Sequence, residues 1–431
     1  VTKVKDGHTV ENTATQVTND KRDKTNTVTN PLKEINPKKD VTVKVGGHSV
    51  DGRSVYLDST FLYQLDSSIL PADRAYQKIA NWGITDRLDP AYDKATGQWA
   101  VYAARDLYRG GEAIARKGER IAGSGFDSSR LGGDMFTANI DPSTGLVDIQ
   151  ATQAYLDLVS ADDAHEQGWR AYVQVTRVKV TDRHENVFTE HVNGKDLTSN
   201  IVWTRTPDLT PGIKLEKWDR RSGWPKGDRD DSKDALDGAR DGDVIVFTIT
   251  NTSKDEDGHG AWFKASDLKL EDHTIVGDGE VKDLKYPDNW STLVLKPGDS
   301  VEVTGTLTGF TTATHTDRAK VTGTPLVECP VVDKDPFGDA SGKPSTGGEA
   351  GDGPRQVTVG DRTLCEDTPV ESNTDDWNGR RSLLGETGSA ILPLGVGALL
   401  MAGLGAAVVM VRRRKSAHDD KDAALMPRHA A

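Results

Sequence analysis

Cysteine is nearly absent from this sequence of 431 residues, which contains only Cys329 and Cys365. Two cysteines exclude a disulfide-rich scaffold and a zinc site built from cysteine ligands. Basic residues are also in the minority, with 54 Lys and Arg against 67 Asp and Glu, which gives a formal net charge of −13. Because binding to the phosphate backbone needs a basic face, we expect no nucleic-acid partner.

Apolar residues are scarce as well: they make up 35% of the chain, and the mean hydropathy is −0.57. That balance is polar for one compact enzyme. The sequence contains no Gly-x-Ser-x-Gly, no His-Glu-x-x-His and no phosphate-binding loop, which are the motifs of common catalytic sites. We therefore expect a protein of about three domains that is not an enzyme.

One long apolar run, residues 391–411, lies near the C-terminus and carries no charge. It is long enough to cross a bilayer as a helix. Four basic residues, 412–415, follow at once, and the positive-inside rule places them in the cytoplasm. The sequence predicts a transmembrane segment over 389–411 and a cytoplasmic tail over 412–431, and no other contact with a membrane.

A short motif, residues 384–388, stands just before this run and includes Leu384, Thr387 and Gly388. The motif, the apolar run and the basic tail together resemble a sortase cell-wall sorting signal, although Gly385 stands where the commonest form has Pro. The resemblance implies cleavage between Thr387 and Gly388, with sortase and peptidoglycan as partners. The alternative is an ordinary single-span anchor.

The N-terminus lacks a starting Met and has no basic region followed by an apolar stretch, so no signal peptide is expected. Residues 1–30 also align with residues 175–204 at an offset of 174 positions, without a gap. We interpret residues 1–31 as the end of a preceding domain of the same kind, in the C-terminal part of a longer secreted protein. Tandem repeats of this size favour a stalk over a catalytic core.

Residues 32–208 are rich in β signals. Alternating apolar residues predict strands over 40–45 and 171–180, and Asn193-Gly194 is a hairpin turn signal. Such a turn would bring Asn186 nearly opposite Asn200 and Ile201. The pattern predicts an all-β chain of tandem antiparallel, immunoglobulin-like β-sandwiches.

Several motifs in this segment occur in a fixed order: they lie at 35–43, 50–52, 69–72, 84–86, 96–99 and 185–207. Together they resemble the C-terminal domains of the streptococcal antigen I/II adhesins. The resemblance implies β-sandwiches that carry an internal Lys–Asn isopeptide bond. It also implies a role in attachment to host glycoproteins, extracellular matrix proteins or other cells.

The alternation of strand side chains makes this chemistry plausible. Lys39 shares strand parity with Val41, Val43 and Val45, and Asp86 shares parity with Trp82 and Ile84. A lysine on an apolar face loses its charge readily and becomes a nucleophilic amine. A buried carboxyl group stays protonated and can activate an amide carbonyl.

The resemblance implies a role for each residue of the bond. Lys39 would be the nucleophile, Asn186 the acceptor and Asp86 the acid, with Asn200 as the alternative acceptor. Asn12 matches Asn186 in the repeat and would be the acceptor of the preceding domain, whose lysine lies outside this sequence.

Residues 209–325 read as another β-sandwich, with strands over 243–252 and 300–307 and a closing strand over 320–325. The segment resembles the conserved-repeat domains of bacterial surface proteins, which implies a spacer. A second isopeptide bond from Lys217 or Lys214 to Asp317, helped by Glu302, is chemically allowed, but the spacer is the simpler interpretation.

Acidic residues crowd two loops of this segment: Asp228, Asp230, Asp231, Asp234 and Asp237, and then Asp255, Glu256 and Asp257. Oxygen-rich loops can hold Ca²⁺, but the spacing completes no EF-hand. We expect solvated acidic loops and no cofactor or metal, with Ca²⁺ as the alternative.

Residues 326–383 are rich in Gly, Pro, Ser and Asp, which predicts a flexible linker through the cell wall. Outside the cell, its two cysteines, Cys329 and Cys365, can pair. The whole sequence thus predicts a surface adhesin anchored in the cell wall of a Gram-positive bacterium, with a covalently braced stalk. The alternatives are the non-catalytic anchor region of a wall-bound enzyme and a subunit of a sortase-assembled pilus.

Overall fold

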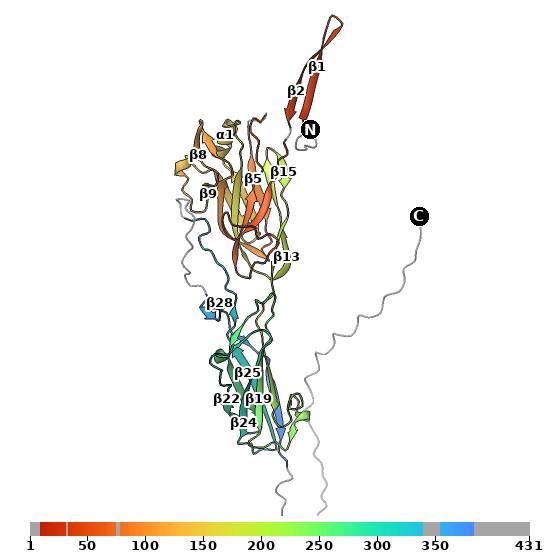
Figure 1. Cartoon of the computed structure of the whole chain (residues 1–431), viewed down its shortest axis with the longest axis vertical. Coiled ribbons are helices and arrows are strands. Elements are labelled where there is room, and N and C mark those ends of the chain that lie inside the picture. Colours follow the sequence, from red (N-terminus) through yellow and green to blue (C-terminus); the bar gives the residue numbers. More distant parts are fainter. Residues whose placement is uncertain (1–8, 32, 75–77, 339–353, 383–431) are drawn as a thin grey trace, which may run out of the picture. The chain divides into compact units, whose positions relative to one another are not determined.

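The computed structural model of the chain describes residues 9–31, 33–74, 78–338 and 354–382 (Figure 1). Within these residues nearly all regular structure is β-strand, and the one α-helix is α1, Gln153–Ala161. Most strand pairs are antiparallel. The predicted all-β class is confirmed.

A hairpin forms the N-terminal part of the described chain, with β1 at Thr9–Thr18 and β2 at Lys21–Pro31. Its turn residues Asn19 and Asp20 have φ of 50° and 64°, and Asn193 and Gly194, at the predicted offset of 174 positions, have φ of 45° and 71°. Positive φ at both central residues is the geometry of a type I′ hairpin turn. The internal repeat is therefore visible in the backbone as well as in the sequence.

The first sandwich consists of two five-stranded sheets. In one sheet the order is β3 (Lys38–Thr42), β4 (Thr60–Asp66), β12 (Trp169–Arg177), β6 (Asp93–Ala103) and β9 (Arg120–Gly123). In the other it is β10 (Phe136–Asp141), β11 (Leu146–Ala151), β5 (Trp82–Arg87), β14 (Phe188–Val192) and β15 (Lys195–Thr198). Two smaller pairs complete it: β7 (Leu107–Arg109) with β8 (Glu112–Ala115), and β13 (Thr181–Asn186) with β16 (Val202–Thr206).

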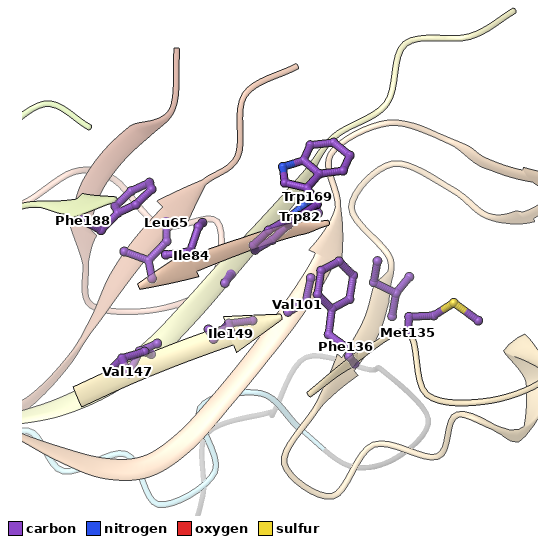
Figure 2. Close-up of a cluster of buried hydrophobic side chains, with 14 of the residues drawn as sticks. Leu65, Trp82, Ile84, Val101, Met135, Phe136, Val147, Ile149, Trp169 and Phe188 are labelled. Atoms are coloured by element: carbon purple, nitrogen blue, oxygen red, sulfur yellow. The ribbon is translucent and has the colours of Figure 1, made fainter. Parts of the chain in front are cut away.

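Aromatic and branched side chains from both sheets fill the space between them (Figure 2). Trp82 on β5 meets Trp169 on β12 with 6.1 Å between ring centroids, and Phe136 on β10 lies 4.8 Å from Trp169. Large aromatic side chains bury much apolar surface and prefer such tilted contacts. This packing holds β5 against the sheet that contains β3, and so sets the distance between β3 and β5.

Strand parity is correct for β5 and only partly correct for β3. On β5, Trp82, Ile84 and Asp86 are buried and Arg87 is exposed. On β3, Lys39 and Val41 are buried, but the strand ends at Thr42 and Val43 is 52% exposed. The prediction that Val43 shares the buried face is wrong, because the chain turns before that residue.

The second sandwich has its own core, to which both of its sheets contribute. One sheet has the order β17 (Ile213–Asp219), β19 (Val244–Asn251), β24 (Ser300–Thr308) and β22 (Glu280–Lys285). The other has the order β18 (Leu236–Asp237), β30 (Asp375–Arg380), β25 (Thr314–Gly323) and β21 (Lys269–Val276), and β29 (Val370–Glu371) also pairs with β25. Shorter strands lie beside them: β20 (Phe263–Lys264) with β23 (Val294–Leu295), and β26 (Leu326–Val327), β28 (Arg362–Glu366) and β27 (Gln356–Val359).

This topology corrects the prediction of a domain over 209–325 followed by a flexible linker over 326–383. Strand β30 runs beside β25 inside the second sandwich, so 320–325 does not close it, and Trp377 on β30 has no exposed surface. Phe337 is buried against Leu62, Ala100 and Tyr172 of the first sandwich. The linker prediction failed because a few buried residues, widely spaced among Gly, Ser and Asp, leave composition almost unchanged.

The two cysteines lie in this same segment. Cys329 and Cys365 form a disulfide with 4.9 Å between their Cα atoms. Cys365 belongs to β28, which pairs with β26. The disulfide therefore joins the chain just after β26 to a neighbouring strand of the same small sheet.

No helix among the described residues is long and apolar enough to cross a membrane. The predicted sorting motif 384–388, the transmembrane segment 389–411 and the tail 412–431 lie outside the described residues, and these three remain predictions.

Candidate functional site

A buried lysine and a buried carboxyl group meet between the two sheets of the first sandwich. The side chains of Lys39 on β3 and Asp86 on β5 are 0% and 1% exposed, and Lys39 Nζ pairs with Asp86 Oδ2. The amine also lies 4.4 Å from the centroid of the Tyr63 ring and 5.7 Å from that of Phe188. The structure thus brings together the predicted nucleophile and the predicted acid, within an aromatic enclosure.

Burial shifts both groups toward their neutral forms. Loss of solvent lowers the pKa of Lys39, against the attraction of Asp86. Burial likewise raises the pKa of Asp86, against the effects of Lys39 and Asn186. Two separated charges are expensive in an apolar interior, so both shifts favour the pair of a neutral amine and a carboxylic acid over the ion pair. A free amine can attack a carbonyl carbon, whereas an ammonium cannot.

The predicted acceptor, Asn186, is the last residue of β13 and is buried. Two residues later, Phe188 pairs with Asp86 across the ladder between β14 and β5, which brings the start of β14 to the acid. The side-chain oxygen Oδ1 of Asn186 accepts a hydrogen bond of 2.6 Å from the N–H of Val187. Among the described residues, Asn186 Nδ2 and Asp86 Oδ1 are buried polar atoms without a hydrogen-bond partner. Such atoms are costly, and Nδ2 is the atom that an amide exchange would release as ammonia.

The alternative acceptor, Asn200, binds the main chain of Lys39 and not its side chain. Its Oδ1 accepts from the N–H of Lys39 at 2.8 Å, and its Nδ2 donates to the carbonyl oxygen of Lys39 at 3.0 Å. The side chain thus continues the ladder along the main chain of β3, and the residue is exposed. It faces the backbone of Lys39 and does not enter the enclosure around the amine. Asn186 pairs with Val202, one position beyond the expected Ile201.

The residue that matches Asn186 in the repeat, Asn12, lies on β1 opposite Val28 and is exposed, like the rest of that strand. No described residue encloses it. Its role as the acceptor of a preceding domain remains a prediction.

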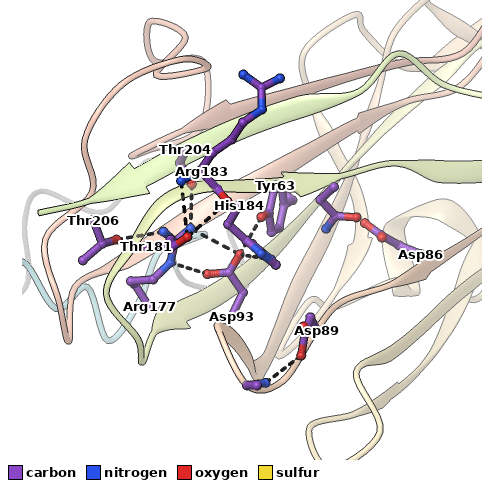
Figure 3. A network of polar contacts seen from close by, with 12 residues as sticks. Tyr63, Asp86, Asp89, Asp93, Arg177, Thr181, Arg183, His184, Thr204 and Thr206 are labelled. Carbon is purple, nitrogen blue, oxygen red and sulfur yellow. Dashed lines mark hydrogen bonds and ion pairs between the residues drawn. The ribbon is translucent and has the colours of Figure 1, made fainter. Parts of the chain in front are cut away.

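A second buried pair, which the sequence analysis did not single out, supports the wall of the site (Figure 3). Arg177 Nε and Asp93 Oδ1 are 2.6 Å apart, and neither side chain is exposed. Tyr63, whose ring lies against the lysine, donates its hydroxyl to Asp93 at 2.6 Å. Arg177 also donates to Thr204 and Thr206 on β16. Arg177 shares strand parity with Val173 and Val175, and that signal could have identified it.

The first of the two acidic loops, residues 228–237, contributes Asp228 to a cluster of three carboxylates. One carboxylate oxygen from each of Glu216, Asp228 and Asp375 lies within 4.8 Å of the others. Burial and neighbouring carboxyl groups raise the pKa of Asp228 to about 6 and that of Asp375 to about 8. The other acidic residues of the loop are exposed: Asp230, Asp231, Asp234 and Asp237. The Ca²⁺ alternative stays a prediction, and among the described residues this cluster is the candidate site for it.

The residues considered for a second isopeptide bond divide into two groups. Lys217 and Asp317 are completely buried. Lys214 is 56% exposed and pairs with Glu216, and Glu302 is exposed on β24. The predicted helper Glu302 therefore lies on the wrong face of its strand.

Tandem antiparallel sandwiches with separate cores place the chain in the class of modular all-β proteins. Residues 36–207 match the family described as "Cell surface antigen C-terminus", and residues 1–32 match the "Cell surface antigen I/II C2 terminal domain". This part of the chain therefore matches the C-terminal domains of the cell-surface antigen I/II family. The matched families are surface antigens, not enzymes.

Individual proteins are similar to parts of the chain. The "Aggregation substance" of Enterococcus faecalis is 35% identical over 204 residues, which are 46% of this chain and 14% of that protein. The solved C-terminal domain of AspA, an antigen I/II-family protein of Streptococcus pyogenes, is 26% identical, with a TM-score of 0.41, over 46% of this chain and 55% of that one. The C-terminal domain of BspA from Streptococcus agalactiae is 21% identical, with a TM-score of 0.41, over 47% and 59%. The chain thus spans only a small part of its curated relative.

Proposed function

We propose that this chain is the C-terminal stalk of a surface adhesin and that an isopeptide bond between Lys39 and Asn186 braces its first sandwich. The neutral amine of Lys39 attacks the side-chain carbonyl carbon of Asn186. Asp86 protonates the carbonyl oxygen as the new N–C bond forms and later recovers that proton. It also carries one proton from the lysine nitrogen to the amide nitrogen of Asn186, whose C–N bond then breaks, so that one ammonia leaves. The observation that carries the proposal is the complete burial of Lys39 against Asp86, with the buried side chain of Asn186 close enough to Asp86 to influence its pKa.

The position of the bond suits a stalk under tension. Lys39 lies on the first strand of the sandwich, and Asn186 lies 147 positions later, shortly before the chain leaves it. A covalent bond between them would let force bypass the intervening strands and their hydrogen bonds. It would also restrict the unfolded chain, as a disulfide does.

The anchor and the partners complete the proposal. Cleavage between Thr387 and Gly388 by a sortase would join Thr387 to peptidoglycan at the surface of a Gram-positive cell. The family descriptions of surface antigens and the relative named aggregation substance support attachment to host molecules or to other cells. The chain itself would have no catalytic task beyond its own cross-link, and no cofactor.

Peptide mapping tests the bond. The full chain is denatured, its disulfide is reduced, and it is digested with trypsin. A bond predicts one species that joins peptides 39–44 and 184–195 and is lighter than their sum by one ammonia. Lys39→Arg and Asp86→Ala should abolish this species, while the matched surface change Lys38→Arg should leave it. Recovery of both peptides unlinked from the wild-type chain would refute the proposal.

The same digest separates the two candidate acceptors. Asn200→Ala should keep the linked species, because Asn200 contacts only the backbone of Lys39. Loss of the species in Asn200→Ala, together with its persistence in Asn186→Ala, would make Asn200 the acceptor.

A further inference from the structure

The second sandwich buries another lysine in the same kind of setting. On β17, Ile213, Leu215, Lys217 and Asp219 all face inward, so Lys217 stands in a row of buried residues and has no exposed surface. Its Nζ lies 5.2 Å from the centroid of the Phe247 ring on the neighbouring strand β19. A lysine that cannot reach solvent must be compensated within the core.

Two carboxyl groups from the facing sheet meet this amine. Lys217 Nζ is 2.5 Å from Asp272 Oδ1 on β21 and 2.5 Å from Asp317 Oδ1 on β25. Asp272 pairs with Ala319, two positions along β25 from Asp317, so the two acids are diagonal neighbours on adjacent strands. The amine therefore reaches from one sheet to the other and lies between two carboxyl carbons.

The two acids have different surroundings. Asp317 is 0% exposed, sits on an interior strand and faces His315, whose Nε2 is 3.2 Å from Asp317 Oδ2. The side chain of Asp272 is 9% exposed and lies on the edge strand β21. Asp272 can exchange its proton with solvent, whereas Asp317 is confined among Lys217, His315 and Trp377, its partner in the ladder with β30.

The pKa values of Asp272 and Asp317 differ as well. Burial raises the pKa of Asp272 to about 6. Burial alone would raise the pKa of Asp317 too, but Lys217 and His315 hold it below its usual value. Of the two acids, Asp272 is therefore the one that holds a proton more readily, and Asp317 is the one that stays ionised.

A further parallel with the first sandwich concerns the backbone of the lysine strand. Asn373 Oδ1 accepts from the N–H of Leu215 at 2.9 Å, and Asn373 Nδ2 donates to the carbonyl oxygen of Leu215 at 2.9 Å. Asn200 makes the same pair of bonds to Lys39. In both sandwiches an Asn from a later part of the chain thus fixes the first strand at or near its buried lysine.

We propose that Lys217 and Asp317 form a second intramolecular amide bond, for which Asp272 is the proton-transfer group. Lys217 transfers one proton to Asp272, and its neutral Nζ attacks Cγ of Asp317. The N–C bond forms and one C–O bond breaks, and the departing oxygen takes up the proton that Asp272 returns and a second from the nitrogen. An ammonium and a carboxylate become one amide and one water, so no other reactant is needed.

This bond differs from the one in the first sandwich in its acceptor and in its leaving group, which is water and not ammonia. It belongs to a part of the chain outside the matched family segments, 1–32 and 36–207. It would join the first strand of the second sandwich to an interior strand of the facing sheet, a cross-link that the main-chain ladders do not supply.

The tryptic digest of the full wild-type chain tests the proposal without any substitution. An acylated Lys217 is not cleaved, so we expect peptide 215–220 to be joined to peptide 286–318, lighter than their sum by one water. Peptides 215–217 and 218–220, recovered separately and completely, would show an ion-pair cluster only and overturn the proposal. A link from 215–220 to peptide 270–282 would overturn Asp317 as the acceptor in favour of Asp272.

Three variants sharpen the result. Asp317→Asn should still form the linked species with the same mass as wild type, because ammonia leaves in place of water. Asp272→Asn should lose nearly all of it, and persistence there would overturn the role of Asp272. Lys214→Arg, an exposed neighbour on the same strand, should leave it unchanged. The outcome is independent of the bond in the first sandwich, which is read from peptides 39–44 and 184–195.

Discussion

The double variant Lys39→Met with Asp86→Asn isolates the covalent contribution to the stability of the first sandwich. Removing Lys39 alone would leave a buried acid unpaired, which is costly in itself. The double variant replaces the pair with neutral side chains of similar size, so the loss of the cross-link is the main remaining change. Asn186 is retained, and with it the hydrogen bond to Val187.

The magnitude follows from the length of chain that the bond closes. With 147 positions between Lys39 and Asn186, loop-closure entropy predicts a loss of about 5 kcal/mol from the free energy of unfolding. For a domain of this size the midpoint of thermal unfolding should fall by about 10 to 20 °C.

Differential scanning calorimetry of the full chain measures this loss. The transition of the first sandwich should move down, while that of the second sandwich, whose core is separate, should stay in place. Lys38→Met, a change at the exposed neighbouring position, is the matched control and should move neither. An unchanged first transition in the double variant would refute the view that a cross-link at Lys39 stabilises this domain.

Asn200→Ala removes two hydrogen bonds to the backbone of Lys39 and should lower the free energy of unfolding by about 2 kcal/mol in denaturant titrations, with the linked peptide intact. The pKa of Asp375 is raised to about 8 from an ordinary 3.8, so the folded state binds this proton more tightly and stability should fall as pH rises between these values. In Asp375→Asn that decline should be smaller, and an identical pH profile would contradict the assignment. If the carboxylate cluster holds Ca²⁺, millimolar Ca²⁺ should raise the unfolding midpoint in wild type and not in Asp228→Asn.

Local patterns in the sequence were sufficient for some of these features. Strand parity correctly predicted that Lys39 and Asp86 face inward, because successive side chains alternate between the faces of a strand. The repeat found in the sequence reappears in the structure as two hairpins with the same turn geometry. Parity failed at Val43 because it says nothing about where a strand ends, and β3 stops at Thr42.

Long-range features were poorly predicted. Glu302 is the expected helper in the second sandwich, but the carboxyl group that contacts Lys217 there is that of Asp272. The linker prediction missed β30, whose Trp377 is completely buried. A strand that enters a sheet from a distant part of the chain carries no local signal of its neighbours. When one large side chain does most of the packing, the apolar content of the strand is low, and composition does not reveal that the strand is buried.

The sequence by itself determined which side chains share a face within a strand, since alternation is a property of each strand alone. It also determined the likeness between two segments 174 positions apart. Only the tertiary structure decided which buried groups meet: Lys39 with Asp86, and Lys217 with two carboxyl groups. The reason is physical. Burial shifts a pKa and orients an amine only when strands from distant parts of the chain close the space around it, and that closure depends on the pairing of sheets and not on any one segment.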